Sequence, residues 1–327
     1  MGPRLRVHAT VALAAAVAVA AVVGITVWQT SGERTTVPGA VVAPRAGYPP
    51  LSLELGLRAD AQARALDAAQ RAYNRGRVAQ AARVFARYRS LEAQLGSAFA
   101  AWKRTGLDPV KRLAAGHPAS AVAALHLGWA DYWAGRNADA LAAWQHTAAL
   151  APDSPYGVDA EDALHPTDPV PGLPPIVTPL ELPPALADLP AGEQLARLRA
   201  TARSGGLDAK LRYGLALWNV RRPVSAEREL AAAAKLAPHD PVARVAAAVA
   251  RFSKGNPVRA FGQLGPLTAV FPHAAVVEFH LGLLLLWTGE RTKAATQLRA
   301  CVADGPQTIY AKNARVLLAS LTNNGTK

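Results

Sequence analysis

The sequence predicts an all-α protein of repeated antiparallel helix pairs, preceded by one N-terminal transmembrane helix. Three observations lead to this prediction: the composition, a 34-residue period and an uncharged run near the N-terminus. Of the 327 residues, 51% are hydrophobic but only 6% are aromatic. A chain that is rich in alanine and poor in aromatic residues favours helices over strands. The single cysteine excludes an intrachain disulfide framework and a cysteine-rich zinc or iron–sulfur site.

The uncharged run covers residues 9–28. A helix of that length spans about 30 Å, which is about one bilayer hydrocarbon core. Arg4 and Arg6 precede the run. The positive-inside rule then keeps residues 1–8 in the cytoplasm and places the rest of the chain outside it. We expect a single-pass protein of the cell membrane.

A cleaved signal peptide is the alternative, since Ala18 and Ala20 form an A-x-A pattern. The apolar run continues to Trp28 and is longer than a typical signal core, which favours an uncleaved anchor. Residues 29–57 contain proline, glycine and threonine without periodicity and are predicted to be a linker.

A period of 34 residues runs through the remaining chain. Residues of the same type recur at this spacing: Pro238, Pro272 and Pro306; Ala226, Ala260 and Ala294; and Gly255 and Gly289. A small residue midway along a first helix lets its partner approach, a glycine turns the chain, and a proline ends the unit. A single helix pair cannot bury its apolar face alone, so the copies are expected to stack.

Two stretches, HLGWADYWAGRNADALAAWQHTAALAPDSP and HLGLLLLWTGERTKAATQLRACVADGP, closely resemble tetratricopeptide (TPR) repeats. The resemblance implies a TPR-like α-solenoid, with good copies at 121–154, 207–240, 241–274 and 275–308. A degenerate copy is expected from Gln62 to Leu95, an irregular helical stretch over 97–116, and a capping helix over Ile309–Leu321. The expected organisation is N-terminal repeats over 58–154, an insert over 155–206, C-terminal repeats with the cap over 207–321, and a tail over 322–327.

The insert is acidic in a basic chain. Residues 137–196 contain nine acidic and no basic residues, whereas the whole chain carries a net charge of +13. The insert is also rich in proline, so we expect extended or irregular backbone that ends in a helix near residues 192–204. One interpretation is a solvated connector; the other is a segment that docks across the basic solenoid and neutralises it.

In TPR proteins, the first helices of the repeats line a concave face. The resemblance implies an apolar and aromatic groove for a protein or peptide partner, lined by Leu125, Trp129, Tyr132, Leu211, Leu215, Trp218, Val249, Phe252, Phe279 and Leu283. The alternative is that these side chains belong to the core or are covered by the insert.

No pattern indicates an enzyme, a cofactor site or a metal site. The sequence contains no HExxH, no phosphate-binding glycine loop and no GxSxG motif. His126 and His280 share one repeat position, which a structural role explains. Asp159, Glu161 and Asp162 lack EF-hand spacing and indicate a solvated cluster. Cys301 replaces an alanine of the repeat and is expected to be buried.

These observations predict a membrane-anchored TPR scaffold that mediates protein–protein interaction or complex assembly at the cell envelope. The alternative is electrostatic binding of an anionic envelope polymer or membrane surface; nucleic acid is disfavoured by the extracytoplasmic location. The basic residues concentrated in the first repeat support the alternative: Arg58, Arg64, Arg71, Arg75, Arg77, Arg83, Arg87 and Arg89. The preference for arginine and alanine indicates a GC-rich bacterial source.

Overall fold

The computed structural model describes residues 43–323, and every regular element in that range is a helix. The predicted all-α class is therefore confirmed for this part of the chain. The predicted membrane-spanning helix, residues 9–28, lies outside the described residues. Among the helices within 43–323, none is both long and apolar enough to cross a membrane.

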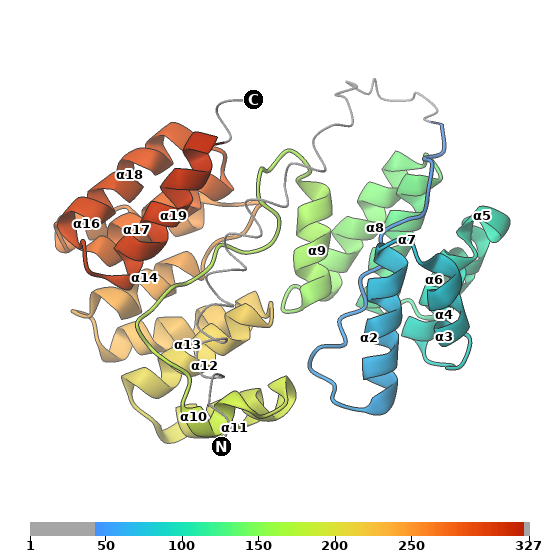
Figure 1. The fold of residues 1–327 in the computed structure, drawn as a ribbon, viewed down its shortest axis with the longest axis horizontal. Helices are drawn as coiled ribbons and strands as arrows, with labels where there is room; N and C mark the ends of the chain where they lie inside the picture. Colours follow the sequence, from blue (N-terminus) through green and yellow to red (C-terminus); the bar gives the residue numbers. More distant parts are fainter. Residues whose placement is uncertain (1–42, 324–327) are drawn as a thin grey trace, which may run out of the picture. The chain divides into compact units, whose positions relative to one another are not determined.

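The described residues separate into two compact units (Figure 1). The N-terminal unit contains residues 43–164 and 190–193, and the C-terminal unit contains residues 165–189 and 194–323. The helices up to residue 164 are α2 (Ala61–Asn74), α3 (Val78–Phe85), α4 (Leu91–Ala100), α5 (Trp102–Thr105), α6 (Asp108–Gly116), α7 (Ala121–Trp133), α8 (Asn137–Leu150) and α9 (Pro155–Leu164).

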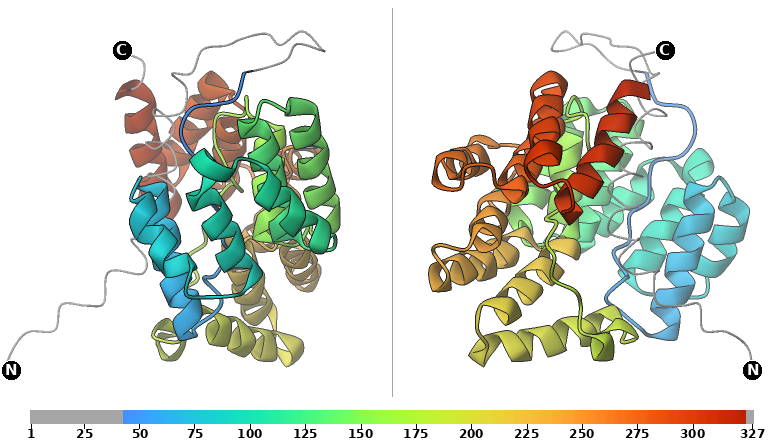
Figure 2. Two further views of the ribbon diagram at one scale, coloured as in Figure 1. Left: turned by 90° about the vertical axis from the view of Figure 1, so that its right-hand side faces the viewer. Right: turned by 60° about the vertical axis from the view of Figure 1, so that its left-hand side comes forward.

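The helices that follow residue 164 are α10 (Pro184–Ala187), α11 (Ala191–Ser204), α12 (Leu207–Asn219), α13 (Pro223–Leu236), α14 (Pro241–Val249), α15 (Val258–Leu264), α16 (Leu267–Val270), α17 (Ala275–Trp287), α18 (Arg291–Asp304) and α19 (Ile309–Asn323). The helices α2–α3, α7–α8, α12–α13 and α17–α18 pack as consecutive pairs. Figure 2 shows these pairs side by side within each unit. Each pair has a short connection, so its helices run antiparallel, as the repeat pattern predicts.

In three of these pairs, α7–α8, α12–α13 and α17–α18, a glycine in the first helix allows the second helix to approach closely. A Cβ atom on Gly128 of α7 would lie 2.3 Å from the indole nitrogen of Trp144 on α8. A Cβ on Gly214 would lie 2.6 Å from Leu230, and one on Gly282 would lie 2.9 Å from Leu298. The repeated small residue therefore sets the spacing of the two helices, as the sequence predicts.

The helix ends follow the expected local signals. The side chains of Ser120 and Asp240 accept hydrogen bonds from the backbone N–H groups of Ala123 and Ala243, which caps α7 and α14. The second helix of the repeat at 241–274 is split into α15 and α16, and Pro266 stands at the break. A proline there interrupts the helix because it lacks an N–H and clashes with the preceding turn.

Two stretches differ from the sequence prediction. Residues 155–164 are predicted to be part of the irregular insert, but they form α9, which packs against α7 and α8 in the N-terminal unit. The degenerate copy was extended to Leu95, whereas α4 begins at Leu91 and packs against α6 as a further, irregular pair. Proline is well suited to the first position of a helix, where Pro155 stands in α9. The sequence prediction treats the prolines of this region only as residues that break helices.

Candidate functional site

Residues 45–57, here called the first segment, run as an extended coil against the helices of the N-terminal unit, where they precede α2 (Figure 1). Leu51, Leu53 and Leu55 are only 2–3% exposed and belong to the core of this unit. Their alternation is the period-two pattern of an extended chain with one buried face. The prediction that residues 29–57 are a linker is therefore wrong for the first segment.

The first segment is held mainly through its backbone. The four consecutive N–H groups of residues 51–54 each donate to a helix side chain. The acceptors are, in order, Asn74 Oδ1 at 3.4 Å, His126 Nε2 at 3.2 Å, Gln70 Oε1 at 2.6 Å and the Tyr156 hydroxyl at 3.2 Å. Pairing of every amide in turn leaves no buried N–H unsatisfied in this stretch.

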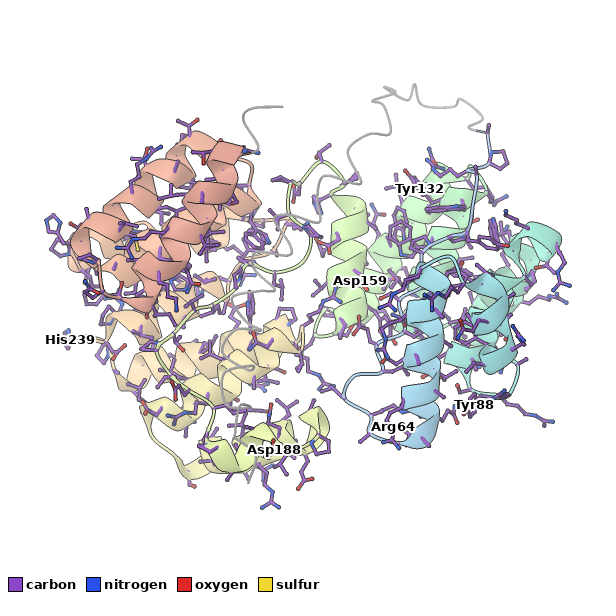
Figure 3. The ribbon with its side chains drawn as sticks, in the orientation of Figure 1. Arg64, Tyr88, Tyr132, Asp159, Asp188 and His239 are labelled. Atoms are coloured by element: carbon purple, nitrogen blue, oxygen red, sulfur yellow. The ribbon has the colours of Figure 1, made fainter. Side chains whose placement is uncertain are left out.

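Carbonyl oxygens of the first segment are also paired. The Tyr73 hydroxyl donates to the carbonyl of Pro49 at 2.7 Å, and Trp133 Nε1 donates to that of Ala46 at 3.3 Å. In addition, Ser52 donates its hydroxyl to the carboxylate of Asp159 on α9 at 2.7 Å. Figure 3 labels Asp159 on α9 and Tyr132 near the end of α7, the two helices that hold the first segment together with α2.

Residues 170–182, here called the second segment, occupy the corresponding position in the C-terminal unit. They form the yellow-green coil that precedes α10 (Figures 1 and 2). Side chains again pair with the backbone. From the helices, Trp287 Nε1 donates to the carbonyl of Gly172 (3.2 Å), Trp218 Nε1 to that of Pro174 (2.8 Å) and Arg212 Nε to that of Glu181 (3.0 Å), while His280 Nε2 accepts from the N–H of Val177 (3.0 Å). From the turn between α14 and α15, Lys254 Nζ donates to the carbonyl of Val170 (2.9 Å).

The two segments share a motif. Residues 47–51 read Gly-Tyr-Pro-Pro-Leu, and residues 172–176 read Gly-Leu-Pro-Pro-Ile. Both glycines have a positive φ, 86° at Gly47 and 73° at Gly172, which other residues adopt only at a cost. Each proline fixes its own φ and restricts the residue before it to an extended conformation. We refer to this pattern as the Gly-X-Pro-Pro-aliphatic motif.

The helix residues that contact the motif are also equivalent in the two units. His126 and His280 each occupy the sixth position of their helix, and Trp133 and Trp287 each occupy its last position. Tyr73 and Trp218 each precede the turn that ends the first helix of a pair, and each donates to the carbonyl of the first proline in the motif. The chain therefore contains the same arrangement twice: an extended segment, and a set of helices that holds it.

Each shared histidine has one defined role. His126 Nδ1 lies 2.6 Å from the carbonyl of Val122, and His280 Nδ1 lies 2.7 Å from that of Val276. Since a carbonyl can only accept, Nδ1 carries the proton and Nε2 is free to accept from the segment. Burial lowers the pKa of both histidines to about 4, so both are neutral at pH 7.

The predicted groove residues all lie among the described residues, and none is exposed. Trp129, Tyr132 and Leu215 are partly buried, and the remaining seven are buried: Leu125, Leu211, Trp218, Val249, Phe252, Phe279 and Leu283. Trp218 contacts the second segment directly, and the Arg45 guanidinium of the first segment lies 3.3 Å from the ring centre of Tyr132. All ten side chains belong to, or pack against, the hydrophobic cores of the two units.

The insert docks, but apolar and backbone contacts are prominent in the docking. Val170 is buried in the core of the C-terminal unit, and Ile176 and Leu180 pack against that core. Arg212 and Lys254 contribute, yet they donate to backbone carbonyls of the segment. Apolar packing and bonds to the backbone therefore hold the insert in addition to any attraction between its acidic residues and the basic chain.

The acidic and cysteine residues that the sequence offers for metal binding or thiol chemistry contact other parts of the protein or lie in its core. Among residues 43–323, no group of three or more His, Cys, Asp or Glu side chains is placed to hold a metal ion. Asp159 accepts from Ser52 of the first segment. Cys301 is buried in the core, and burial raises the pKa of its thiol to about 12, which disfavours the reactive thiolate.

No family model matches the chain, and no curated protein sequence matches it. Among solved structures, YrrB, described as a TPR protein with an unusual peptide-binding site, is similar with 16% identity over 64% of this chain and 99% of its own, at a TM-score of 0.32. The C-terminal part of a TPR repeat-containing protein from Cytophaga hutchinsonii is similar with 13% identity over 76% and 98%, at a TM-score of 0.27. The Cut9–Hcn1 hetero-tetramer of APC/C is similar with 14% identity over 79% and 56%, also at a TM-score of 0.27.

Proposed function

We propose that this protein is a non-catalytic interaction scaffold whose helical units bind extended peptide segments. One observation carries the proposal: each unit already holds such a segment, through side chains that pair with its backbone. Backbone pairing supplies affinity, and pockets for alternate side chains supply selectivity. The proline pair also restricts the free segment, so less conformational entropy is lost on binding.

We place this scaffold at the cell envelope. Support for this location comes from the sequence of residues 9–28, which is long and apolar enough to serve as an anchor. In cells that express the full chain, we expect it to sediment with membranes and to resist carbonate extraction. Its C-terminal end should be open to external protease once the outer layers are permeabilised. A chain that appears soluble and shortened by the N-terminal residues would refute the anchor.

The scaffold role is tested by site-specific photo-crosslinking in intact cells. A photoreactive residue replaces Leu182, which is 37% exposed at the end of the second segment, and a matched control replaces Val258, which is 72% exposed on α15. We expect crosslinks to another protein from position 182 and fewer from position 258. Crosslinks only within one chain or only to lipid at both positions would refute protein binding.

A second candidate function is attachment to an anionic polymer or membrane surface. Arg75, Arg77, Arg83, Arg87 and Arg89 are all exposed on α3 and its flanks. Closely spaced guanidinium groups attract phosphate-bearing surfaces, and this attraction weakens as salt screens it. Binding to anionic vesicles should therefore fall steeply with salt and fall further in a double variant, Arg83→Glu with Arg87→Glu. Binding that is insensitive to both changes would exclude this candidate.

A further inference from the structure

The helix surface that holds each segment is here called its groove. The two grooves pair the backbone groups of their segments to different extents. In the N-terminal unit, the Tyr156 hydroxyl accepts from the N–H of Glu54, the seventh residue after the motif glycine. Tyr310 stands at the equivalent position of the C-terminal unit, since Tyr156 is the second residue of α9 and Tyr310 is the second residue of α19. Its hydroxyl is buried and has no hydrogen-bond partner among the described residues.

The reason lies in the occupant. The seventh residue after Gly172 is Pro179, and proline has no N–H to donate. The ring of Tyr310 lies 5.9 Å, centre to centre, from that of His280, which accepts from Val177 of the same segment. By its equivalence to Tyr156, which accepts from Glu54, Tyr310 is the acceptor that corresponds to an amide at position 179, and the present occupant lacks that amide. A buried hydroxyl without a partner costs free energy that a better-matched peptide would recover.

Other contacts differ in the same direction. Gln70, which accepts from Leu53, is replaced by the apolar Leu215 at the corresponding position before the turn. Leu51, Leu53 and Leu55 are buried, whereas Ile176 and Leu180 are only partly buried and Pro179 is exposed. Counting bonds between described residues alone, the second segment is therefore held by fewer backbone hydrogen bonds, and it buries less apolar surface.

We propose that the groove of the C-terminal unit is an exchangeable peptide site that takes an extended segment from a partner protein. The segment has the Gly-X-Pro-Pro-aliphatic motif and a residue other than proline seven positions after the glycine. This inference rests on the proposed scaffold function and names the ligand class of that function. The second segment is the resident occupant, and the partner segment displaces it by also pairing with Tyr310.

The partner is another protein rather than a second copy of this chain. The only described segment of the chain with a non-proline residue at that position is the first segment, and its N–H groups at residues 51–54 are all paired in its own groove. Transfer of the first segment to the C-terminal groove of another copy would break these four hydrogen bonds and form fewer in their place. Exchange between copies is therefore unfavourable, and it is one outcome that the experiment detects.

The experiment measures peptide binding to the full chain in detergent by fluorescence anisotropy. The probe is a labelled peptide with the sequence RAGYPPLSLELGL of the first segment, and its matched partner carries proline in place of the glutamate that corresponds to Glu54. The chain carries Ile176→Asp, which weakens the resident segment without altering the groove. Circular dichroism checks that the helices are retained.

We expect the glutamate peptide to bind about 3- to 10-fold more tightly than the proline peptide, the effect of one hydrogen bond. Tyr310→Phe should abolish this difference, whereas Tyr156→Phe should leave it unchanged. In the unmodified chain, amides of the second segment should exchange hydrogen faster than those of the first segment. The probe should accelerate exchange of the second segment further.

Three results would overturn the proposal: equal affinity of the two peptides, a difference that survives Tyr310→Phe, or no binding to the Ile176→Asp chain. Self-association of the chain that the probe competes away would instead assign the site to a second copy and also overturn it. These failures are distinct from failure of the scaffold function. Crosslinks to a partner without probe selectivity would refute only the ligand, and probe selectivity without cellular crosslinks would refute only the scaffold.

Discussion

Two tyrosines at equivalent positions should respond in opposite directions to the loss of their hydroxyl groups. Tyr156 accepts a hydrogen bond from the N–H of Glu54 at 3.2 Å, whereas the buried hydroxyl of Tyr310 has no partner among the described residues. Replacement of either tyrosine by phenylalanine keeps the ring and its packing. The comparison therefore isolates the hydrogen bond in two closely matched surroundings.

The magnitude follows from the state of each hydroxyl. Tyr156→Phe removes a bond of about 1 kcal/mol and leaves the amide of Glu54 without its acceptor, so the free energy of unfolding should fall by about 1–2 kcal/mol. Tyr310→Phe removes a buried hydroxyl whose desolvation is not offset by any bond, so the free energy of unfolding should rise by about 1 kcal/mol. The two variants should differ by about 2–3 kcal/mol.

Urea denaturation followed by circular dichroism measures both changes at neutral pH. With a typical slope of about 1–3 kcal/mol per molar urea, each variant should shift its midpoint by roughly 0.5–1 M, in opposite directions. Hydrogen exchange supplies a local readout, since Tyr156→Phe should accelerate exchange at Glu54 and its neighbours. If both variants are destabilised to the same extent, the assignment of Tyr310 as an unpaired acceptor is wrong.

Three further changes test the site and the helix packing. Burial lowers the pKa of His126 and His280 from 6.5 to about 4, so between pH 6.5 and pH 4 the folded chain binds fewer protons than the unfolded chain. The free energy of unfolding should therefore fall as the pH drops through this range, by about 2 kcal/mol for each histidine at pH 5. Equal urea midpoints at pH 7.5 and pH 5 would contradict this prediction. Gly47→Ala should lower the free energy of unfolding by about 1 kcal/mol, because φ is 86° at this position. Gly56→Ala is the control, since φ is not positive there and a Cβ would meet no neighbour; thermal melts should show almost no change. Gly128→Ala should cost about 1–3 kcal/mol in the same assay, since its Cβ would lie 2.3 Å from the facing indole of α8; an unchanged melting temperature would show that the helices can separate freely.

Much of the fold could be predicted because the repeat signals are local. The glycine at Gly128, Gly214 and Gly282 and the closing proline act within one helix pair, so their spacing alone predicts helix, turn and helix. The repeats predicted at 207–240 and 275–308 begin at the first residues of α12 and α17. The start of α9 was missed because Pro155 both begins a helix and resembles a breaker.

The candidate site was predicted only in part. The first helices do line the surfaces in question, but the ten residues proposed for an open groove lie in the core or beneath the segments. The residues that contact the segments include His126 and His280, which the sequence indicated only as a shared repeat position. The recurrence of Gly-X-Pro-Pro-aliphatic at Gly47 and Gly172 was the signal that could have identified both segments.

The amino-acid sequence by itself determined the helical class, the 34-residue repeat and the closeness of each helix pair, because these depend on contacts between neighbours in the chain. Only the tertiary structure decided what covers the first helices. The hydrogen bonds from Ser52 to His126 and from Val177 to His280 join residues 74 and 103 positions apart. Such contacts form only when the stacked pairs bring distant side chains to one surface, and no local propensity encodes them.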